Sequence, residues 1–298
     1  MRKIISSKDL RSVSIVGVGL LGGSIGLAIR AAGVQAERVG LGRRRSSINR
    51  ALRVGAVDVG TLSPKRGLGG ADLAIVATPI GRFEAVFRQL ADHLPDGAVV
   101  TDVGSTKQYV LDLARRLLPT RIRFVGSHPM AGSENAGVDF ARADLFQRAQ
   151  CLIVPPSGCD PEAVLLVEDF WHRIGMRTTR MTAQQHDQWV AQVSHLPHVL
   201  ASALVELAAA GGSLDIAATG FQDTTRVASG HPEMWLDILM TNRRGVCRAI
   251  DDLVDRLHAI RGWLRTGRSD AVAGFLDRAK RARDAWIQRR YAEQEIEP

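Results

Sequence analysis

The sequence predicts an α/β domain with a parallel sheet over residues 1–180 and an all-helical domain over residues 181–298. Short β-branched runs alternate with stretches of helical spacing in the first part, and these runs are apolar almost throughout. Such runs are typical of parallel strands that helices cover on both faces. The strand pattern does not recur after Arg180, so the chain changes class near that residue.

The composition is that of a globular protein with two hydrophobic cores. The chain has 298 residues, of which 45% are hydrophobic, and this is ample for two medium-sized domains. Its three cysteines form no CxxC pair, so we predict neither a zinc knuckle nor a disulfide framework and expect a reducing compartment. The first apolar run is broken by glycines and has the pattern of neither a secretory signal nor a membrane span. We therefore expect a cytoplasmic protein without a membrane partner.

The net charge of +8 raises the question of a nucleic-acid partner. The basic residues gather at 43–45, 242–244 and 277–290, without interleaved aromatic platforms or a DNA- or RNA-binding signature. Ahead of the last run, Val272 and Phe275 keep helical spacing, which indicates the solvated face of an amphipathic helix. We expect no nucleic-acid partner, and the charge can instead attract anionic ligands.

Strand and helix candidates alternate through the first domain. The strand candidates are, in order, SVSIVG, RVGLG, ADLAIVATP, AVVTDVG, RFVGSH and CLIVPP. Helical spacing is found between them, over residues 20–32, 46–54, 80–93, 106–118 and 160–174. This order of elements predicts a sheet built from strand-helix-strand units.

The second domain begins with a capping box, because Thr182 can accept from the third backbone N–H and Gln185 can reach back to it. Pro232 suits the first position of a later helix. Two helical seams are formed by Trp189, Val193, Leu196, Leu200, Ala203 and Leu207, and by Ile250, Leu253, Leu257, Ile260 and Leu264. Stripes this apolar commonly pack against another chain, so we predict a homodimer through the helical domain.

The segment GVGLLG is a candidate dinucleotide-binding turn between a strand and a helix. Gly17 permits a tight turn, Gly19 lets the backbone approach a pyrophosphate, and Gly22 allows close packing of the helix. Leu20 and Leu21 open that helix, whose free N–H groups and positive dipole favour an anion. The segment therefore predicts a Rossmann-type domain that binds a dinucleotide cofactor.

Two further segments bear on the cofactor. The second strand ends in Gly42, followed by Arg43 and Arg44, where an enzyme specific for NAD needs a carboxylate for the ribose. Guanidinium groups there can bind a 2′-phosphate, so we predict that NADP is used at least as well as NAD; the alternative is that the arginines are merely solvated. Thr78 and Pro79 end the third strand candidate, where they either line the nicotinamide side of the cofactor or simply terminate the strand.

His128 is a candidate general base. It stands in GSHPMAGSENAG, directly after an apolar run, and Ser105 follows the preceding strand. Both side chains are expected at the edge of the sheet where ligands bind. A neutral imidazole can take the hydroxyl proton of an alcohol as hydride leaves, and a serine beside it can orient the imidazole or bond the same hydroxyl. The alternative is a packed or surface histidine.

Six motifs together resemble the prephenate/arogenate dehydrogenase family of tyrosine biosynthesis. They are GVGLLGGSIGLA, ATP, TDVGSTK, GSHPMAGSENAG, HDQWVAQVSHLPH and GFQDTTRVASGHPEMW, and they span almost the whole chain in order. The resemblance implies the oxidative decarboxylation of a cyclohexadienol. In that reaction hydride passes from C4 to the nicotinamide, CO₂ leaves from C1, and the ring becomes aromatic. The resemblance implies prephenate as the substrate, with arogenate or aminodeoxyprephenate as alternatives.

The resemblance also implies roles for residues of the first domain. His128 accepts the hydrogen bond or the proton of the C4 hydroxyl, and Ser105 supports it. Ser133 and Glu134 lie at the mouth of the substrate site.

Four residues of the second domain correspond to further family positions. Arg226 binds a substrate carboxylate, for which a planar guanidinium is suited, and Asp223 holds that arginine or gates entry. His195 and Trp235 lie near the substrate, with Trp235 offered to the neighbouring subunit.

Three other interpretations are less favoured by the sequence. A β-hydroxyacid dehydrogenase is expected to carry a catalytic lysine in the first long interdomain helix, and residues 182–210 contain none. A non-catalytic NADP-sensing dimer is expected to have lost His128 or Arg226. His195 and His198 are spaced like metal ligands but have no third ligand at suitable spacing, so we predict no metal site.

Overall fold

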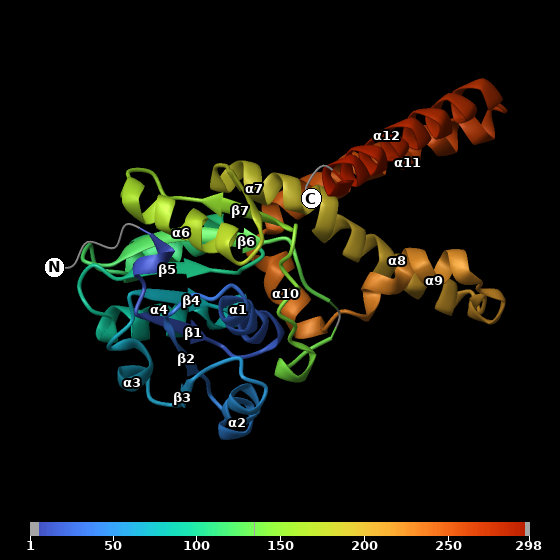
Figure 1. Cartoon of the computed structure of the whole chain (residues 1–298). Helices are drawn as coiled ribbons and strands as arrows, with labels where there is room; N and C mark the ends of the chain where they lie inside the picture. Colours follow the sequence, from blue (N-terminus) through green and yellow to red (C-terminus); the bar gives the residue numbers. More distant parts are fainter. Residues whose placement is uncertain (1–5, 134, 296–298) are drawn as a thin grey trace. The chain divides into compact units, whose positions relative to one another are not determined.

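A single sheet forms the centre of the first part of the chain (Figure 1). The structure is a computed structural model, and it describes residues 6–133 and 135–295. Within these residues the sheet has eight strands in the order β3-β2-β1-β4-β5-β6-β7-β8. The strands are β1 (Ser12–Val16), β2 (Glu37–Leu41), β3 (Val59–Thr61), β4 (Leu73–Val76), β5 (Val99–Asp102), β6 (Arg123–Pro129), β7 (Gln150–Val154) and β8 (Arg177–Arg180). The order of the first six is that of a doubly wound dinucleotide-binding sheet.

The predicted parallel sheet is confirmed, with one exception that the sequence did not indicate. β7 runs antiparallel to β6, with His128 opposite Leu152, and parallel to β8. An antiparallel neighbour needs no helical crossover. The described residues between β6 and β7 accordingly form a loop with one short 3-10 helix, η3 (Val138–Phe140).

Helices cover both faces of the sheet, as predicted. They are α1 (Leu20–Ala31), α2 (Arg45–Arg53), α3 (Pro64–Leu68), α4 (Phe83–His93), α5 (Gln108–Leu117) and α6 (Pro161–Arg173). Alternate residues of a strand point to opposite faces. Val13 and Ile15 therefore join a core with α1, α2 and α6, whereas Val16 joins a second core with α3, α4 and α5. The short elements β3, α3 and β8 were not predicted.

The second part of the chain is helical, as predicted. Its helices are α7 (Ala183–Val190), α8 (Leu196–Ala210), α9 (Thr219–Thr225), α10 (Pro232–Thr241), α11 (Arg243–Arg265) and α12 (Ser269–Glu295). The capping box at α7 is confirmed: Thr182 Oγ1 accepts the Gln185 N–H, and Gln185 Oε1 accepts the Thr182 N–H. Pro232 is the first residue of α10, also as predicted.

A π-helical turn, Ala191–His195, joins α7 to α8 without a break. It precedes Pro197, which lacks an N–H and whose ring would clash with the carbonyl of Val193 in a regular helix. The wider turn accommodates the proline, so the predicted helical seam continues past it.

Helix α10 packs against η2 (Ile80–Arg82) and the loop that follows β5. Ile238 is buried in the core on the side of α3, α4 and α5. Asp237 accepts the Gly81 N–H at 3.0 Å, and Thr241 Oγ1 lies 3.0 Å from Thr106 Oγ1. By these contacts the first of two compact units extends to Gly245, and the second begins at Val246. These units are defined by contacts between residues, so they do not test the domain boundary predicted at residue 180, which stays a prediction.

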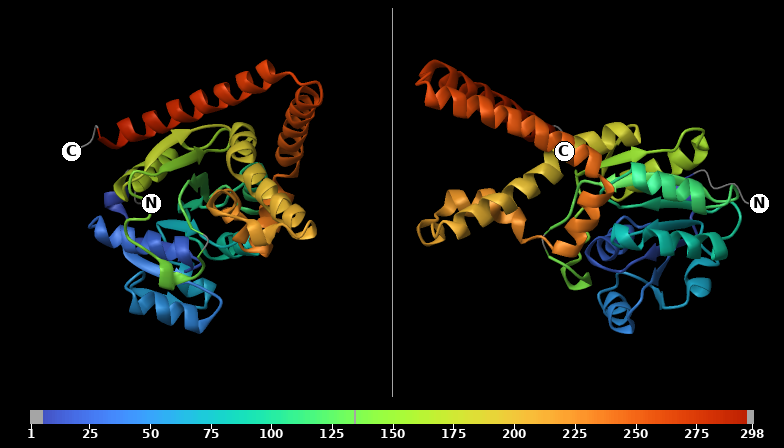
Figure 2. Two further views of the ribbon diagram at one scale, coloured as in Figure 1. Left: turned by 90° about the vertical axis from the view of Figure 1, so that its right-hand side faces the viewer. Right: turned by 180° about the vertical axis from the view of Figure 1, so that it is seen from behind.

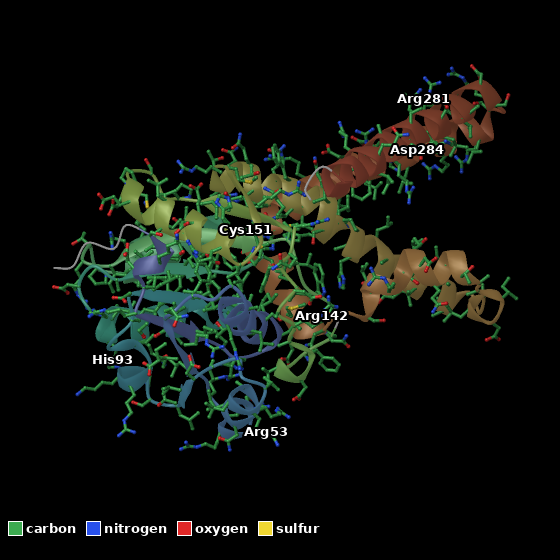
Figure 3. The ribbon with its side chains drawn as sticks, in the orientation of Figure 1. Arg53, His93, Arg142, Cys151, Arg281 and Asp284 are labelled. Carbon is green, nitrogen blue, oxygen red and sulfur yellow. The ribbon has the colours of Figure 1, made fainter. Side chains whose placement is uncertain are left out.

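The second compact unit contains most of α11 and all of α12, joined by a short turn with Gly267 at φ +64° (Figure 2). Of the charged side chains that the structure describes in α12, those from Asp270 to Arg289, all are exposed except the half-buried Asp284 (Figure 3). Arg281 pairs with Asp277, and Lys280 pairs with Asp284, each four residues apart. These pairs form the solvated helix face that the sequence predicts.

Candidate active site

The glycine-rich turn after β1 has the geometry of a dinucleotide cradle. Gly17 has φ +100°, and a Cβ there would lie 2.7 Å from the Ala77 carbonyl oxygen. A Cβ on Gly22 would lie 1.9 Å from the Gly17 carbonyl oxygen. Among the described residues, by contrast, no atom lies within 4 Å of a Cβ built on Gly19. The fold itself therefore requires Gly17 and Gly22, whereas the space above Gly19 suits a ligand.

The first turn of α1 completes this cradle. Gly19 precedes the helix, which begins with the half-buried Leu20 and Leu21. Thr78 follows β4 beside Gly17, and its buried Oγ1 has no hydrogen-bond partner among the described residues. Pro79 is exposed and precedes the short 3-10 helix η2 (Ile80–Arg82). A buried hydroxyl without a partner beside free helix N–H groups fits a polar, anionic cofactor.

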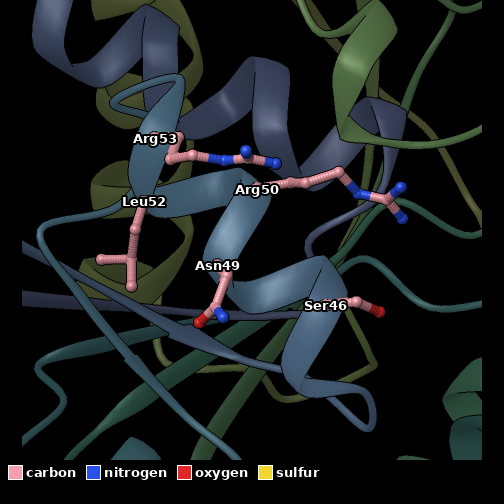
Figure 4. A pocket seen from close by; sticks show the side chains of 5 residues that line it. All are labelled: Ser46, Asn49, Arg50, Leu52 and Arg53. Atoms are coloured by element: carbon pink, nitrogen blue, oxygen red, sulfur yellow. The ribbon is translucent and has the colours of Figure 1, made fainter.

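The end of β2 carries the arginines expected to meet a 2′-phosphate. Arg43 and Arg44 are exposed between β2 and α2, and Arg44 stands at the N-cap position without a side-chain cap. A surface hollow on α2 is lined by Ser46, Asn49, Arg50, Leu52 and Arg53 (Figure 4). Three strands separate β2 from β6, so this basic region is distinct from the candidate base.

His128 lies within β6 and not beyond its end, and it is only 9% exposed. Its Nδ1 lies 2.9 Å from Nε2 of His186, and His186 Nδ1 lies 2.8 Å from Oδ1 of Asp187. Asp187 also accepts the backbone N–H groups of Lys107 and Gln108, at 2.7 and 3.0 Å. The three side chains form a continuous hydrogen-bonded chain inside the protein.

The direction of this chain of hydrogen bonds follows from Asp187. Burial opposes its ionisation, but the hydrogen bonds from His186, Gln108 and Lys107 prevail and lower its pKa. An ionised carboxylate can only accept, so His186 donates from Nδ1 and accepts at Nε2. His128 therefore donates from Nδ1, and its Nε2 keeps a free lone pair. Burial, followed by the neighbouring His186 and Lys107, holds the pKa of His128 well below its ordinary value.

Ser105 is half-buried and lies in the loop after β5, which is the strand next to β6 in the sheet. This loop is held by the fully buried Lys107, whose Nζ lies 2.7 Å from Asp102 Oδ2 and 2.7 Å from the Gly104 carbonyl oxygen. Asp102 also accepts the backbone N–H of Ser127, at 3.1 Å. The ion pair thus ties the loop that carries Ser105 to the strand that carries His128.

His195 lies at the end of the π-helical turn and is 1% exposed. Its Nδ1 is 3.2 Å from Nδ2 of Asn242, which also donates to the Asp187 carbonyl oxygen at 2.7 Å. Burial lowers the pKa of His195 to about 4. Asn242, Asp187 and His186 therefore connect His195 to His128 by hydrogen bonds.

Trp235 packs against two histidines of its own chain. Its ring stacks on His198 with centroids 3.7 Å apart and meets the edge of His195 at 6.3 Å. Asp223 and Arg226 occupy exposed positions on α9 and on the 3-10 helix η6 (Arg226–Ser229), which packs on α8.

Two predicted residues lie in the loop after β6. Ser133 is exposed, and its Oγ accepts the Asn135 N–H at 3.2 Å. Glu134 lies outside the described residues.

Three residues of the hydrogen-bonded network were not predicted. His186 and Asp187 stand in a family motif and Asn242 stands in a basic run, but the sequence assigned no role to any of the three. The family motif was the signal, since the glutamines at 184, 185 and 188 make the local pattern polar and do not single out either side chain. Their contacts cross 58, 80 and 55 residues of sequence, so no local spacing could show them.

Known proteins resemble the chain over almost its full length. Models of the prephenate dehydrogenase nucleotide-binding domain and dimerization domain match residues 25–180 and 182–278. A prephenate dehydrogenase of Bacillus subtilis is 33% identical over 279 residues, which cover 92% of this chain and 75% of that protein. A cyclohexadienyl dehydrogenase of Zymomonas mobilis is 28% identical over 279 residues, covering 92% and 95%.

A solved structure agrees with these relatives. The crystal structure of prephenate dehydrogenase from A. aeolicus in complex with hydroxyphenyl propionate and NAD⁺ has a TM-score of 0.87 and 30% identity, covering 92% of this chain and 98% of that one. The glycine cradle, the doubly wound sheet and the buried histidine define a nicotinamide-dependent dehydrogenase. The chain belongs to the prephenate dehydrogenase family.

The two glycines of the cradle should respond differently to an added methyl group. Gly19→Ala meets open space, so we expect unfolding within about 1 °C of wild type but a cofactor Kd raised by roughly tenfold or more. Gly22→Ala collides with the Gly17 carbonyl and should cost about 1–3 kcal/mol of folding stability. Thermal unfolding and cofactor titration by fluorescence measure the two effects. Unchanged cofactor affinity in Gly19→Ala would contradict the proposed cradle.

Proposed function

We propose that this enzyme converts prephenate to 4-hydroxyphenylpyruvate by oxidative decarboxylation, with His128 as the general base. The observation that carries the proposal is the series of hydrogen bonds from Asp187 through His186 to His128. These bonds leave the lone pair of His128 Nε2 available. The bound nicotinamide supplies a hydride acceptor for C4 of the substrate. As C4 gives up its hydride, the hydroxyl proton passes to His128 Nε2, and the electron pair of the bond between C1 and the carboxylate moves into the ring as CO₂ leaves. The ring is then an aromatic phenolate, which takes the proton back from His128 to give the phenol.

Other side chains bind and orient the substrate in this proposal. Ser105 hydrogen-bonds the C4 hydroxyl or His128, and Arg226 binds a carboxylate through its planar guanidinium. Asp223 holds Arg226 or gates entry, and Ser133 lies at the mouth of the site. His195 and Trp235 flank the substrate from the helical part. The family resemblance implies that Glu134 also lies at the mouth of the site, and this stays a proposal.

The proposed cofactor preference rests on the end of β2. Gly17, Gly19, Leu20, Leu21 and Gly22 hold the pyrophosphate, and Thr78 and Pro79 line the nicotinamide side. Arg43 and Arg44, exposed beside the N-terminus of α2, provide positive charge for a 2′-phosphate. We propose that NADP is used at least as well as NAD.

We also propose a cytoplasmic homodimer formed through the helical part. Within the described residues, 183–210 form the single helical stretch long and apolar enough to cross a membrane by length and composition, and only 17% of its apolar window is buried. The stretch also carries His186, Asp187, His195 and His198, which are buried against the protein itself. Its exposed apolar side chains, Val193 and Leu207 among them, are 68% and 72% exposed. The match to a dimerization domain favours a second copy as their partner.

The role of His128 is tested by His128→Asn. The asparagine amide can still donate to His186, because it occupies the place of Nδ1, but no group replaces Nε2. We expect kcat with prephenate to fall by roughly two to four orders of magnitude, with cofactor Kd nearly unchanged. Stopped-flow absorbance of the reduced nicotinamide measures this, and near-wild-type turnover would dispose of the role.

Two controls belong to that experiment. His172→Asn removes an exposed histidine of α6 that is hydrogen-bonded to Thr178 of β8, and this change should leave kcat unchanged. Because protonated His128 cannot accept the substrate proton, kcat/KM should fall as pH drops through the pKa of His128. Burial holds that pKa well below 6.5, so activity should persist at pH 6.5. Assays with arogenate in place of prephenate identify the preferred substrate.

Cofactor preference is tested with Arg43→Ala, Arg44→Ala and the double variant. Loss of a charged partner for the 2′-phosphate should raise the KM for NADP by roughly 10- to 100-fold and that for NAD by about twofold or less. Arg66→Ala on the exposed face of α3 removes the same charge elsewhere and should change neither. A wild-type enzyme with a strong preference for NAD would refute the proposal.

The dimer is tested by light scattering at micromolar concentration, where the mass should be that of two chains. The double variant Val193→Glu, Leu207→Glu places two charges at the exposed apolar positions. It should be monomeric, because a dimer would bury these unpaired carboxylates in its interface. Leu165→Glu, at a 55% exposed position on α6, is the matched control and should remain dimeric. A monomeric wild-type protein would remove the claim.

A further inference from the structure

Asn242 occupies a buried position where the chain passes from α10 to α11. It is 4% exposed and follows the last residue of α10. Its Nδ2 lies 2.7 Å from the main-chain carbonyl oxygen of Asp187 and 3.2 Å from Nδ1 of His195. One side-chain amide therefore joins the end of α10 to the two segments that carry the candidate base network and His195.

The first of these contacts fixes the orientation of the amide. A carbonyl oxygen can only accept a hydrogen bond, so the atom 2.7 Å from it must be the NH₂ group of Asn242 and not its oxygen. The second proton of the same NH₂ group points to His195. Since that contact is also a donation from Asn242, Nδ1 of His195 must present its lone pair.

The proton of His195 must then reside on Nε2. Burial holds the pKa of this histidine at about 4, so the ring is neutral near pH 7 and carries a single N–H. Nε2 is buried and has no hydrogen-bond partner among the described residues. A buried N–H without an acceptor is costly, which points to an acceptor that arrives with the ligand.

The position of His195 agrees with such an acceptor. Its ring meets the edge of Trp235. Asn242 bonds it to Asp187, whose carboxylate holds His186 against the candidate base. The π-helical turn that ends at His195 is a kind of distortion frequently found at functional sites.

We propose that Asn242 is a positioning residue, which holds His195 in the Nε2–H tautomer so that His195 donates a hydrogen bond to an oxygen atom of the substrate. This proposal rests on the proposed function for the identity of the substrate. His195 and His128 then have opposite tautomers: His195 offers a proton from Nε2, and His128 offers a lone pair at Nε2. The site can thereby donate to one substrate oxygen while it accepts a proton from a substrate hydroxyl.

The tautomer is measured directly by NMR of protein with ¹⁵N-labelled histidine, in the complete enzyme. The signals of His195 are identified by their loss in His195→Gln. We expect wild-type His195 to be neutral with the proton on Nε2. In Asn242→Asp the carboxylate cannot donate, so the proton should move to Nδ1 or both nitrogens should be protonated. A wild-type proton on Nδ1 would overturn the proposal.

A matched pair of substitutions at His195, compared with Asn242→Asp, tests the same point by activity. The amide nitrogen of His195→Gln can reach the place of Nε2 and donate, whereas that of His195→Asn is near the place of Nδ1. We expect the KM for prephenate to rise by roughly tenfold or more in His195→Asn and Asn242→Asp, and less in His195→Gln, with the KM of the cofactor unaffected in all three. Equal effects of Gln and Asn, or effects on the cofactor alone, would overturn the proposal.

These measurements separate the two proposals. If the tautomer of His195 is as expected but prephenate is not oxidised, the proposed function fails and the positioning of His195 by Asn242 stands. If prephenate is oxidised but the proton of His195 resides on Nδ1, the inference about Asn242 fails and the proposed function stands.

Discussion

The buried carboxylate of Asp187 is the interaction on which the rest of the site depends. It is 1% exposed and accepts hydrogen bonds from Lys107, Gln108 and His186, while its own main-chain carbonyl accepts from Asn242. It thus joins the start of α5, the middle of α7 and the end of α10. A buried carboxylate stays ionised only with such donors. The charge of Asp187 therefore depends on the packing of these three segments, and the hydrogen bonds to that charge hold the segments together.

The same burial governs the histidines around it. Removal from water disfavours an imidazolium, and the pKa values of His128, His186 and His195 are all lowered, with burial the largest cause of each. Neutral rings have one donor and one acceptor nitrogen, so their hydrogen-bond partners decide which nitrogen does which. Asp187 decides this for His186 and, through it, for His128. Because His128 is already neutral before a ligand binds, it can accept a proton from the substrate without first losing one of its own.

The sequence predicted those parts that local rules determine. The turn at Gly17 and Gly22, the cap at Thr182 and the strands of the sheet follow from backbone geometry and from apolar periodicity. The direction of β7 could not be predicted, because an apolar run has the same pattern in either direction. The network around Asp187 could not be predicted either, since its partners are brought together only by packing. His128 was predicted to follow its strand but lies within it, and the ring of His186 that holds it was not predicted.

The segment that carries Arg226 is fixed by packing before any ligand binds. The segment passes Trp235 so closely that a Cβ on Gly230 would lie 2.3 Å from the indole nitrogen, so only glycine fits there. The indole in turn stacks on His198 and contacts His195. η6 is thereby held against α8 through one aromatic ring, and its place relative to His195 is set by the protein. A site whose parts are placed in advance loses less conformational entropy when it binds a substrate, which suits a reaction that must align one carbon with a hydride acceptor and its hydroxyl with a base.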